Sequence, residues 1–362
     1  MKSTGFLVSK ANVPAHESPH PPERAGRGPG GGEASSHESG HDVPGEAARP
    51  AGLSRRVLLG TGLAAGVGWA LGGRARAASG QSLALIRKPI PSTREMLPAV
   101  GVGTNNFTAA APEELAARRA VLQKLPELGG SVVDTAAIYG KSEEVIGQNV
   151  AELHLRDRLF ISTKVMVQGG NVEQGKAMIE ESFRRLQTAK IDLLHVHNLA
   201  STDAIMPVLQ QLKHAGRIRY IGLTTSFTGQ HPDMLAAMRA HPVDFIQIDY
   251  SLGNRVAADD ILPLALDKGI AVMLNVPFGG RRGTNLLGKV AGRPLPDWAA
   301  DIDATSWAQV MLKYVIAHPA VTCAIPGTTQ VSHLEDNLRG ARGRLPDATL
   351  RKRMEQTWDS LA

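Results

Sequence analysis

The sequence of 362 residues contains a single cysteine, Cys323, which excludes an intrachain disulfide. It also lacks a strong excess of one charge. The formal net charge is +6, and half of it comes from residues 1–77, which hold nine Lys/Arg and six Asp/Glu. The remaining charge is small and dispersed, so we expect no nucleic-acid partner. Residues 1–50 are almost without large apolar side chains, which excludes a packed core there and predicts a disordered leader.

A long apolar run is also missing after this leader. The Gly/Ala/Leu-rich stretch that ends at Leu71 is too short and too rich in glycine to span a bilayer comfortably. It follows the pair Arg55-Arg56 and precedes Ala75-Arg76-Ala77, an arrangement typical of a twin-arginine signal with an Ala-x-Ala cleavage site. We therefore predict such a signal over residues 51–80, transient contact with the twin-arginine export machinery, and a periplasmic or secreted protein. A disordered basic linker in a cytoplasmic protein is the alternative.

Strand and helix patterns alternate through the rest of the chain, and residues 82–362 are predicted to form one α/β domain. Eight βα units with short apolar strands are typical of a (β/α)8 TIM barrel. An open doubly wound sheet is the alternative, but Gly101-Val102-Gly103 lacks the third glycine of a dinucleotide-binding fingerprint. A small hairpin is predicted between Ala84 and Pro98. The predicted strands are Val100–Thr104, Val132–Asp134, Leu159–Lys164, Ile191–His197, Ile218–Thr224, Phe245–Asp249, Ala271–Asn275 and Thr322–Pro326. The predicted helices are Pro112–Leu128, Ser142–Leu153, Val172–Gln187, Asp203–Ala215, Pro232–Ala240, Val256–Lys268, Thr305–Ala317, Val331–Arg339 and Asp347–Ser360.

Side chains that can take part in catalysis lie at the ends of three successive predicted strands. Asp134, Lys164 and His197 lie at these ends, and Tyr139 lies in the loop after Asp134. Because strand ends meet at one mouth of a barrel, we expect the four side chains to lie close together. The lysine ammonium would stabilise a tyrosinate while the aspartate keeps the lysine charged. Such a phenol could donate a proton to a carbonyl oxygen that His197 orients.

Other interpretations of single residues remain open at this point. Lys164 could form a Schiff base, as barrel aldolases do, and His195 could pair with His197 on a metal. Cys323 is expected to be a core residue. Arg281-Arg282-Gly283 could close over a pyrophosphate or form a solvated loop. The leader histidines could bind metal loosely; they are His16, His20, His37 and His41.

Several short motifs follow one another in a specific order and spacing from about Leu97 to Leu338. They are Gly101-Val102-Gly103-Thr104, Asp134-Thr135-Ala136 with Tyr139-Gly140 and Ser142-Glu143, Ser162-Thr163-Lys164, Ile191-Asp192-Leu193-Leu194 leading to His197, Ile221-Gly222-Leu223, Gln247-Ile248-Asp249-Tyr250 and Ile325-Pro326-Gly327-Thr328. Together they resemble the aldo/keto reductase family. The resemblance implies that Tyr139 is the general acid, that Lys164 and Asp134 tune it, and that His197 orients the substrate.

The same resemblance implies an extended nicotinamide cofactor across the barrel mouth, NADP(H) rather than NAD(H). No metal is expected, because no further Cys, His or acid cluster completes a site with His195 and His197. Gln247 matches the family's carboxamide-binding glutamine, whereas Thr225 and Asn275 stand where many members have an asparagine and a stacking tyrosine. Gly327 and His333 stand where members that prefer NADPH usually have lysine and arginine, which leaves NADH open. Asn105 replaces an aromatic residue of the substrate cleft. The expected cofactor-binding residues are Thr104, Thr225, Gln247, Asn275, Pro277, Gly327, Thr328, His333, Asp336 and Asn337.

These observations predict an NAD(P)-dependent oxidoreductase that reduces a small aldehyde or ketone to an alcohol, with hydride from the nicotinamide and a proton from Tyr139. One alternative is a nicotinamide-binding sensor or interaction module with little turnover. It is motivated by the predicted export, because free NAD(P)H is not expected outside the cytoplasm, and by Asn275. A further alternative is an enzyme that acquires its cofactor in the cytoplasm and is exported holding it.

Overall fold

The computed structural model describes residues 83–108, 111–280 and 285–361. The predicted leader, the signal segment and Arg281-Arg282-Gly283 lie outside these residues. By its internal contacts the chain divides into Met1–Arg76 and Ala77–Ala362, and the fold below is that of the second unit. Within the described residues no helix is long and apolar enough to cross a membrane.

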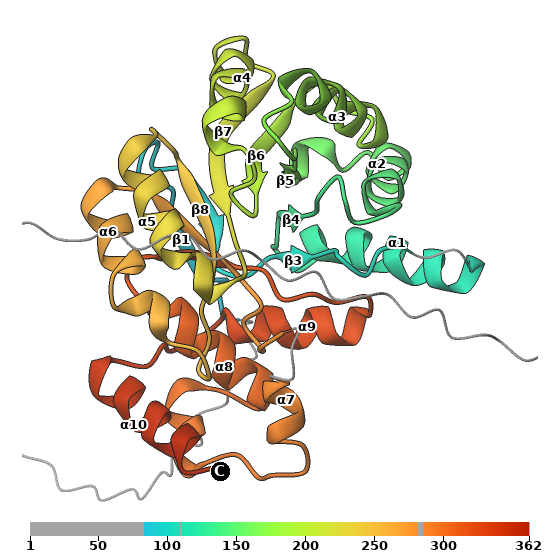
Figure 1. Cartoon of the computed structure of the whole chain (residues 1–362). Helices are drawn as coiled ribbons and strands as arrows, with labels where there is room; N and C mark the ends of the chain where they lie inside the picture. The colour runs from blue at the N-terminus through green and yellow to red at the C-terminus, as the bar shows by residue number, and fades with distance from the viewer. Residues whose placement is uncertain (1–82, 109–110, 281–284, 362) are drawn as a thin grey trace, which may run out of the picture. The chain divides into compact units, whose positions relative to one another are not determined.

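An eight-stranded parallel sheet forms the centre of this unit, with neighbours in sequence order (Figure 1). The first and last strands also bond to each other. Gly101 N donates to Ala324 O at 2.9 Å and Gly103 N donates to Pro326 O at 3.0 Å. The sheet is therefore a closed cylinder, which confirms the predicted (β/α)8 barrel and rules out the open sheet. The strands are β3 Val102–Gly103, β4 Val132–Asp134, β5 Phe160–Val165, β6 Ile191–His197, β7 Ile218–Thr224, β8 Phe245–Asp249, β9 Ala271–Asn275 and β10 Val321–Ala324.

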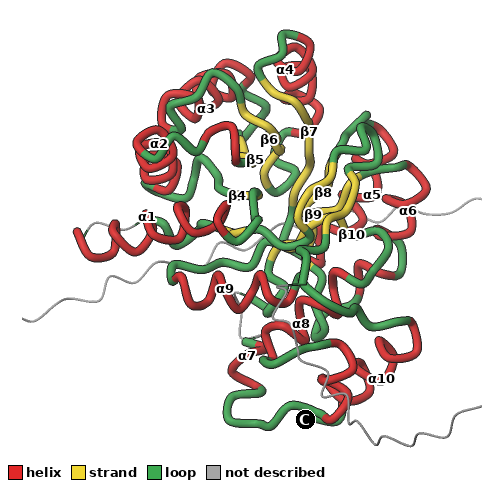
Figure 2. Tube along the Cα trace, turned by 180° about the vertical axis from the view of Figure 1, so that it is seen from behind, coloured by secondary structure: helices red, strands yellow, loops and turns green. Residues whose placement is uncertain are grey.

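Helices surround these strands, as the view from behind shows (Figure 2). Most follow the predicted bounds closely. Short 3-10 turns at Arg156–Arg158 and Thr228–Gln230 were not predicted, and two longer segments also differ. The expected helix Val256–Lys268 is broken into a single 3-10 turn, Val256–Ala258, and a helix that begins at Ile261. Pro263 explains the break, because proline fits the first turn of a helix and not its interior. The stretch before the helix Trp307–Ile316 also contains a short helix, Leu286–Lys289, and a 3-10 segment, Asp297–Ile302, that were not predicted. The α-helices are α1 Pro112–Glu127, α2 Ser142–Glu152, α3 Val172–Arg185, α4 Thr202–His214, α5 His231–Ala240, α6 Ile261–Lys268, α7 Leu286–Lys289, α8 Trp307–Ile316, α9 Val331–Gly340 and α10 Ala348–Asp359.

The predicted hairpin closes one end of the barrel. It consists of β1 Arg87–Pro89 and β2 Met96–Pro98, paired antiparallel. Two of its apolar side chains, Ile90 and Leu97, are 0% and 2% exposed and belong to the cluster that fills the cylinder. The other members come from the strands or directly follow them: Val132, Phe160, Leu193, Tyr220, Phe245, Ala271, Met273, Cys323 and Ile325. This end is therefore packed solid, and Cys323 is buried in it as expected.

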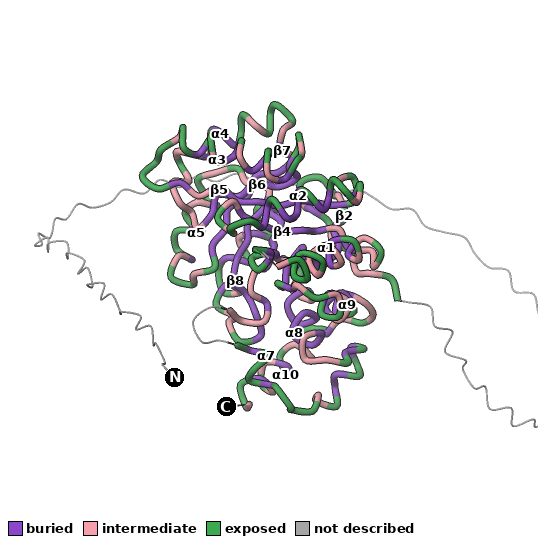
Figure 3. Tube along the Cα trace, turned by 90° about the vertical axis from the view of Figure 1, so that its right-hand side faces the viewer, coloured by how far each residue is buried: buried purple, intermediate pink, exposed green. Residues whose placement is uncertain are grey.

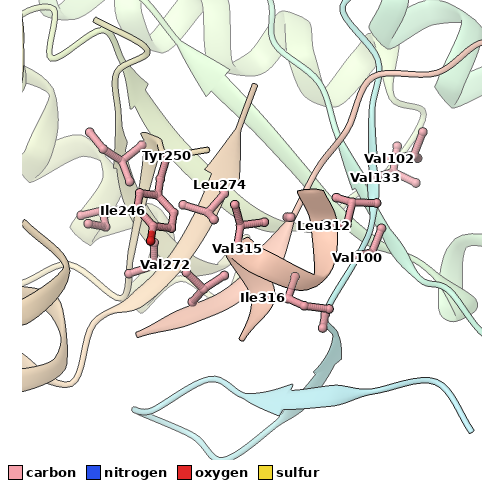
Figure 4. Packing of buried hydrophobic residues seen from close by; sticks show 14 of the residues in the cluster. Val100, Val102, Val133, Ile246, Tyr250, Val272, Leu274, Leu312, Val315 and Ile316 are labelled. Atoms are coloured by element: carbon pink, nitrogen blue, oxygen red, sulfur yellow. The ribbon is translucent and has the colours of Figure 1, made fainter. Parts of the chain in front are cut away.

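A second apolar layer lies between the strands and the helices. Buried segments follow the strands and the inner sides of the helices, while exposed segments lie outside (Figure 3). Leu312, Val315 and Ile316 of α8 belong to the same cluster as Val272 and Leu274 of β9 (Figure 4). With one layer inside the cylinder and one around it, the strands are held on both faces, so side chains at their carboxyl ends have fixed positions.

Candidate active site

A buried ion pair lies at the ends of β4 and β5. Lys164 Nζ donates to Asp134 Oδ2 and to the backbone oxygen of Thr135, both at 2.6 Å. The lysine and aspartate side chains are only 1% and 4% exposed. Asp134 Oδ1 accepts from Ser162 Oγ at 2.8 Å and from Gln247 Nε2 at 2.9 Å. Buried charges persist only when their hydrogen-bonding groups are satisfied, and these contacts fix the ammonium in the barrel mouth.

Two aromatic side chains complete the group. Lys164 Nζ lies 5.3 Å from the centroid of the Tyr139 ring. The rings of Tyr139 and His197 meet edge to face, with centroids 5.9 Å apart and planes at 82°. The structure thus brings together the four predicted catalytic residues, three from the ends of β4, β5 and β6 and one from the loop after β4. The ammonium therefore lies within cation–π distance of the phenol ring at the barrel mouth.

The loop that carries Tyr139 is held at both ends. Ala137 N donates to Lys164 O at 3.2 Å, and Ser142 N donates to Tyr139 O at 3.0 Å. Gly140 follows with φ 55°, a left-handed conformation that glycine adopts without strain. Ser142 Oγ donates to the backbone oxygen of Thr104 at 3.0 Å, so the start of α2 is tied to the loop after β3.

The expected carboxamide-binding residues lie on three neighbouring strands or directly after them: Thr225 follows β7, Gln247 lies in the middle of β8 and Asn275 ends β9. Gln247 is 1% exposed; its Oε1 accepts from Thr224 Oγ1 at 2.9 Å while its Nε2 donates to Asp134. Thr225 is completely buried. Asn275 Nδ2 donates to Thr225 O at 3.0 Å, whereas its Oδ1 is buried without a hydrogen-bond partner among the described residues. An orphaned acceptor at this point suits an amide donor from a ligand.

Gln230 is a mouth residue that the sequence did not reveal. Thr225 Oγ1 donates to Gln230 Oε1 at 2.6 Å, and Gln230 Nε2 donates to Asn198 O at 3.3 Å. The contact joins the loops that follow β6 and β7. Its position near the start of α5 carries no motif, and only the fold shows that this side chain turns back to the mouth. Ser162 could have been found, because it lies two residues before Lys164 and so shares its face of β5.

The residues expected to hold the phosphates lie between β10 and α9. Helix α9 begins at Val331 without a side-chain cap and without an acidic residue in its first turn, so its positive end suits an anion. Gly327 and His333 are exposed and Thr328 is buried. The remaining expected residues are more enclosed. Thr104 donates to Asp134 O at 2.8 Å, Asp336 accepts from Ser306 and Gln309, and Pro277 and Asn337 are buried.

His195 lies deeper in the barrel than His197. It is completely buried, it is paired in register with Lys164, and burial together with the nearby lysine charge holds its pKa well below the usual range. Gly222 makes space for the ring, since a Cβ there would lie 2.2 Å from His195 Nδ1. Within the described residues no group of three or more His, Cys, Asp or Glu side chains could hold a metal. His195 is therefore placed as the interior residue that was expected.

Comparisons with known proteins agree with this geometry. The model of the "Aldo/keto reductase family" matches residues 99–353. The chain is 30% identical over 263 residues to methylglyoxal reductase YeaE of Escherichia coli (strain K12), covering 70% of this chain and 89% of that one. An aldo/keto reductase from Klebsiella pneumoniae, solved with NADP and acetate, is 25% identical with a TM-score of 0.59, covering 73% and 93% of the two chains. Another Klebsiella pneumoniae aldo-keto reductase, solved with NADPH, has the same fold at 24% identity and a TM-score of 0.61, covering 76% and 96%.

The family match extends from the closing contacts of β3 to the terminal helix, and the match to the reductase from Escherichia coli covers 89% of that protein. Barrel, buried ion pair and family therefore lead to one conclusion. The chain belongs to the aldo/keto reductase family and is an NAD(P)-dependent oxidoreductase that acts on carbonyl groups.

Proposed function

We propose that this protein reduces a small aldehyde or ketone, with Tyr139 as the proton donor. The observation that carries the proposal is the Lys164 ammonium held 5.3 Å from the Tyr139 ring by an aspartate that is itself hydrogen-bonded. Tyr139 would donate its phenolic proton to the carbonyl oxygen, and Lys164 would stabilise the phenolate that results. His197, edge to face with the phenol, would orient the same oxygen.

The residues present fit a nicotinamide cofactor at the mouth. Asn275 offers a buried acceptor without a partner among the described residues, and α9 offers an uncapped positive end. We propose that Asn275 and Gln247 hold the carboxamide end and that Gly327, Thr328 and α9 hold the phosphates. When bound, the cofactor supplies the hydride. NADP(H) is favoured by the Klebsiella pneumoniae relative solved with NADP. NAD(H) remains the competitor, because Gly327 and His333 replace the cationic residues expected for NADPH.

The substrate is proposed only as a class. The relative named methylglyoxal reductase supports small aldehydes and ketoaldehydes as the first compounds to assay. Asn105 contributes a polar amide beside Gly327, since a Cβ on that glycine would lie 3.3 Å from Asn105 Oδ1. Asn105 therefore lies next to a residue that we propose to hold the cofactor phosphates, and the substrate class rests on the relative.

Replacing the proposed proton donor tests the function directly. Tyr139→Phe is expected to lower kcat by at least about a thousandfold, because general-acid catalysis and phenolate stabilisation are both lost. Fluorescence titration should show unchanged cofactor binding. Tyr220→Phe is the matched control, since Tyr220 lies in the packed end of the barrel and should retain wild-type kcat. Full turnover in Tyr139→Phe would refute the role of the phenol.

A binding module with little turnover is the second proposal, because Asn275 offers no aromatic face to a nicotinamide ring. It expects tight NADPH binding together with no reduction of any carbonyl in a panel that includes methylglyoxal. Turnover of any panel member above the Tyr139→Phe background would decide for the enzyme.

A further inference from the structure

Glu143 is a completely buried acid that the proposed chemistry does not use. It lies in the first turn of α2, four residues after Tyr139, and its side chain is 0% exposed. Glu143 Oε1 accepts from Thr163 Oγ1 at 2.6 Å. Its Oε2 has no hydrogen bond among the described residues and lies 3.7 Å from Arg185 NH1. Burial raises the pKa of this carboxyl group, against the opposing pull of the hydroxyls of Thr163 and Ser182 and the charges of Arg185 and Lys164.

Thr163 and Arg185, which contact Glu143, also lead to Lys164 and to the loop that carries Tyr139. Thr163 directly precedes Lys164 on β5, and its side chain points to the helix side while the lysine points into the barrel. Arg185, near the end of α3, donates to the backbone oxygen of Ala137 at 3.3 Å, within the loop that carries Tyr139. Glu143 thus connects β5, which carries Lys164, to the loop that carries Tyr139.

A stability argument alone does not explain this residue. Burying a carboxyl group costs free energy that burying an apolar side chain of similar size would not. The contacts nevertheless connect β5, α2, α3 and the Tyr139 loop at one point. Misplacement of a catalytic group by about 1 Å can cost about a hundredfold in rate, so such a connection has a kinetic value that unfolding experiments would not detect.

We propose that Glu143 is a positioning residue, which acts through Thr163 and Arg185 to set the separation between the Lys164 ammonium and the Tyr139 phenol. The proposal rests on the proposed function of Tyr139 as proton donor. It assigns no contact between Glu143 and substrate or cofactor.

Variants of Thr163 give the cleanest test, because they change one hydroxyl. Thr163→Val keeps the shape and removes the donor, and it should lower kcat about tenfold while KM for substrate and Kd for NADPH stay within about twofold. Thr163→Ser keeps the donor and should retain most of kcat. Glu143→Ala should lose more than Thr163→Val.

Two controls separate positioning from stability and from charge. Val145→Ala removes buried methyl groups and no polar group from the same helix, so it should lose stability while keeping kcat. Glu152→Gln changes an acid of the same helix that is 48% exposed and pairs with Arg119, not Arg185, and it should leave kcat unchanged.

A second readout does not depend on turnover. In NMR spectra of protein with isotope-labelled tyrosine, the Tyr139 signal is assigned by its loss in Tyr139→Phe. It should move in Glu143→Ala and Thr163→Val and stay in place in Val145→Ala. An unmoved signal in the first two, or equal loss of kcat in Thr163→Ser and Thr163→Val, would overturn the positioning role. A wild-type protein that reduces no carbonyl but shows the expected shifts would refute the proposed function alone.

Discussion

Asp134 and Lys164 place two full charges inside the protein, and this is costly before it is useful. Removing a carboxylate and an ammonium from water is offset only by close contact and further hydrogen bonds. Ser162, Gln247 and the backbone oxygen of Thr135 supply these bonds. The pair is therefore better understood as a device that keeps an ammonium beside a phenol than as a source of stability.

The first prediction concerns the loss of one partner of this pair. Lys164→Met should lower the free energy of unfolding by about 3–5 kcal/mol, because the Asp134 charge is left buried and unpaired. The double variant Lys164→Met/Asp134→Leu should be more stable than Lys164→Met alone. Urea unfolding of the wild type, both single variants and the double variant gives the coupling energy. Strictly additive effects would contradict the idea of a mutually dependent pair.

A second residue-scale prediction concerns pH. Burial, together with the nearby Arg351 charge, lowers the pKa of Lys88 from 10.5 to about 8. Below this pH Lys88 is charged in both the folded and the unfolded state, and burial of the charge lowers the stability of the folded state in full. Between about 8 and 10.5 the unfolded state binds more protons, so stability should rise with pH relative to Lys88→Met, by about 1–2 kcal/mol after allowance for solvent. Urea unfolding of both proteins across this range measures the difference, and parallel pH curves would contradict it.

The hairpin of β1 and β2 shows how a small element supports the barrel. Its turn is fixed by Glu95, which accepts from Tyr220 OH at 2.6 Å and from Arg219 NH2. Arg219 NH1 in turn donates to Asp192 at 2.9 Å. These contacts hold Ile90 against the aromatic rings at the closed end of the barrel. The ring centroids of Tyr220 and Phe245 are 5.5 Å apart there.

The hairpin therefore has a measurable share in stability. Ile90→Ala should lower the free energy of unfolding by about 2–5 kcal/mol, since the surrounding rings cannot collapse into the space. Met96→Ala is the control on the same hairpin, because Met96 is 48% exposed and should cost less than about 0.5 kcal/mol. Chemical denaturation measures both. A small loss in Ile90→Ala would mean that the barrel end packs without the hairpin.

Regular elements could be predicted where the sequence has a simple period or a clear stop. The apolar runs at β6 and β8 give the observed bounds because both faces of these strands are buried. The break before α6 depends on one proline, and α7 is too short to show a period. The meeting of the four proposed catalytic residues could be predicted because strand ends meet at one mouth. The place of Gln230 at the mouth and the contacts of Glu143 behind β5 could not, because they depend on tertiary contacts alone.

At the scale of the whole molecule, we propose that the segment before the barrel directs export by the twin-arginine route. The pair Arg55-Arg56 and the alanines before residue 78 motivate the proposal, and they lie outside the described residues. That route carries proteins already folded, which suits a barrel that binds its cofactor before export.

The corresponding prediction is a change of compartment. Replacing Arg55 and Arg56 by lysine should leave the protein in the cytoplasm with its reductase activity, because charge is kept while the paired guanidinium groups are lost. Cell fractionation and activity staining measure both. Replacement of Arg24 and Arg27, earlier in the leader, is the matched control. Equal distribution of all three proteins would contradict the signal. NADP(H) in protein purified from the periplasm would support export with bound cofactor.

The bonds from Gly101 and Gly103 to the last strand also have a consequence for synthesis. During synthesis the sheet has two unpaired edge strands until the residues near Pro326 have left the ribosome. Truncated products should consequently be cleared or aggregate rather than persist as partly active enzyme. A circular permutant that starts in a surface loop should still form the hydrogen bonds of Gly101 and Gly103 with the last strand.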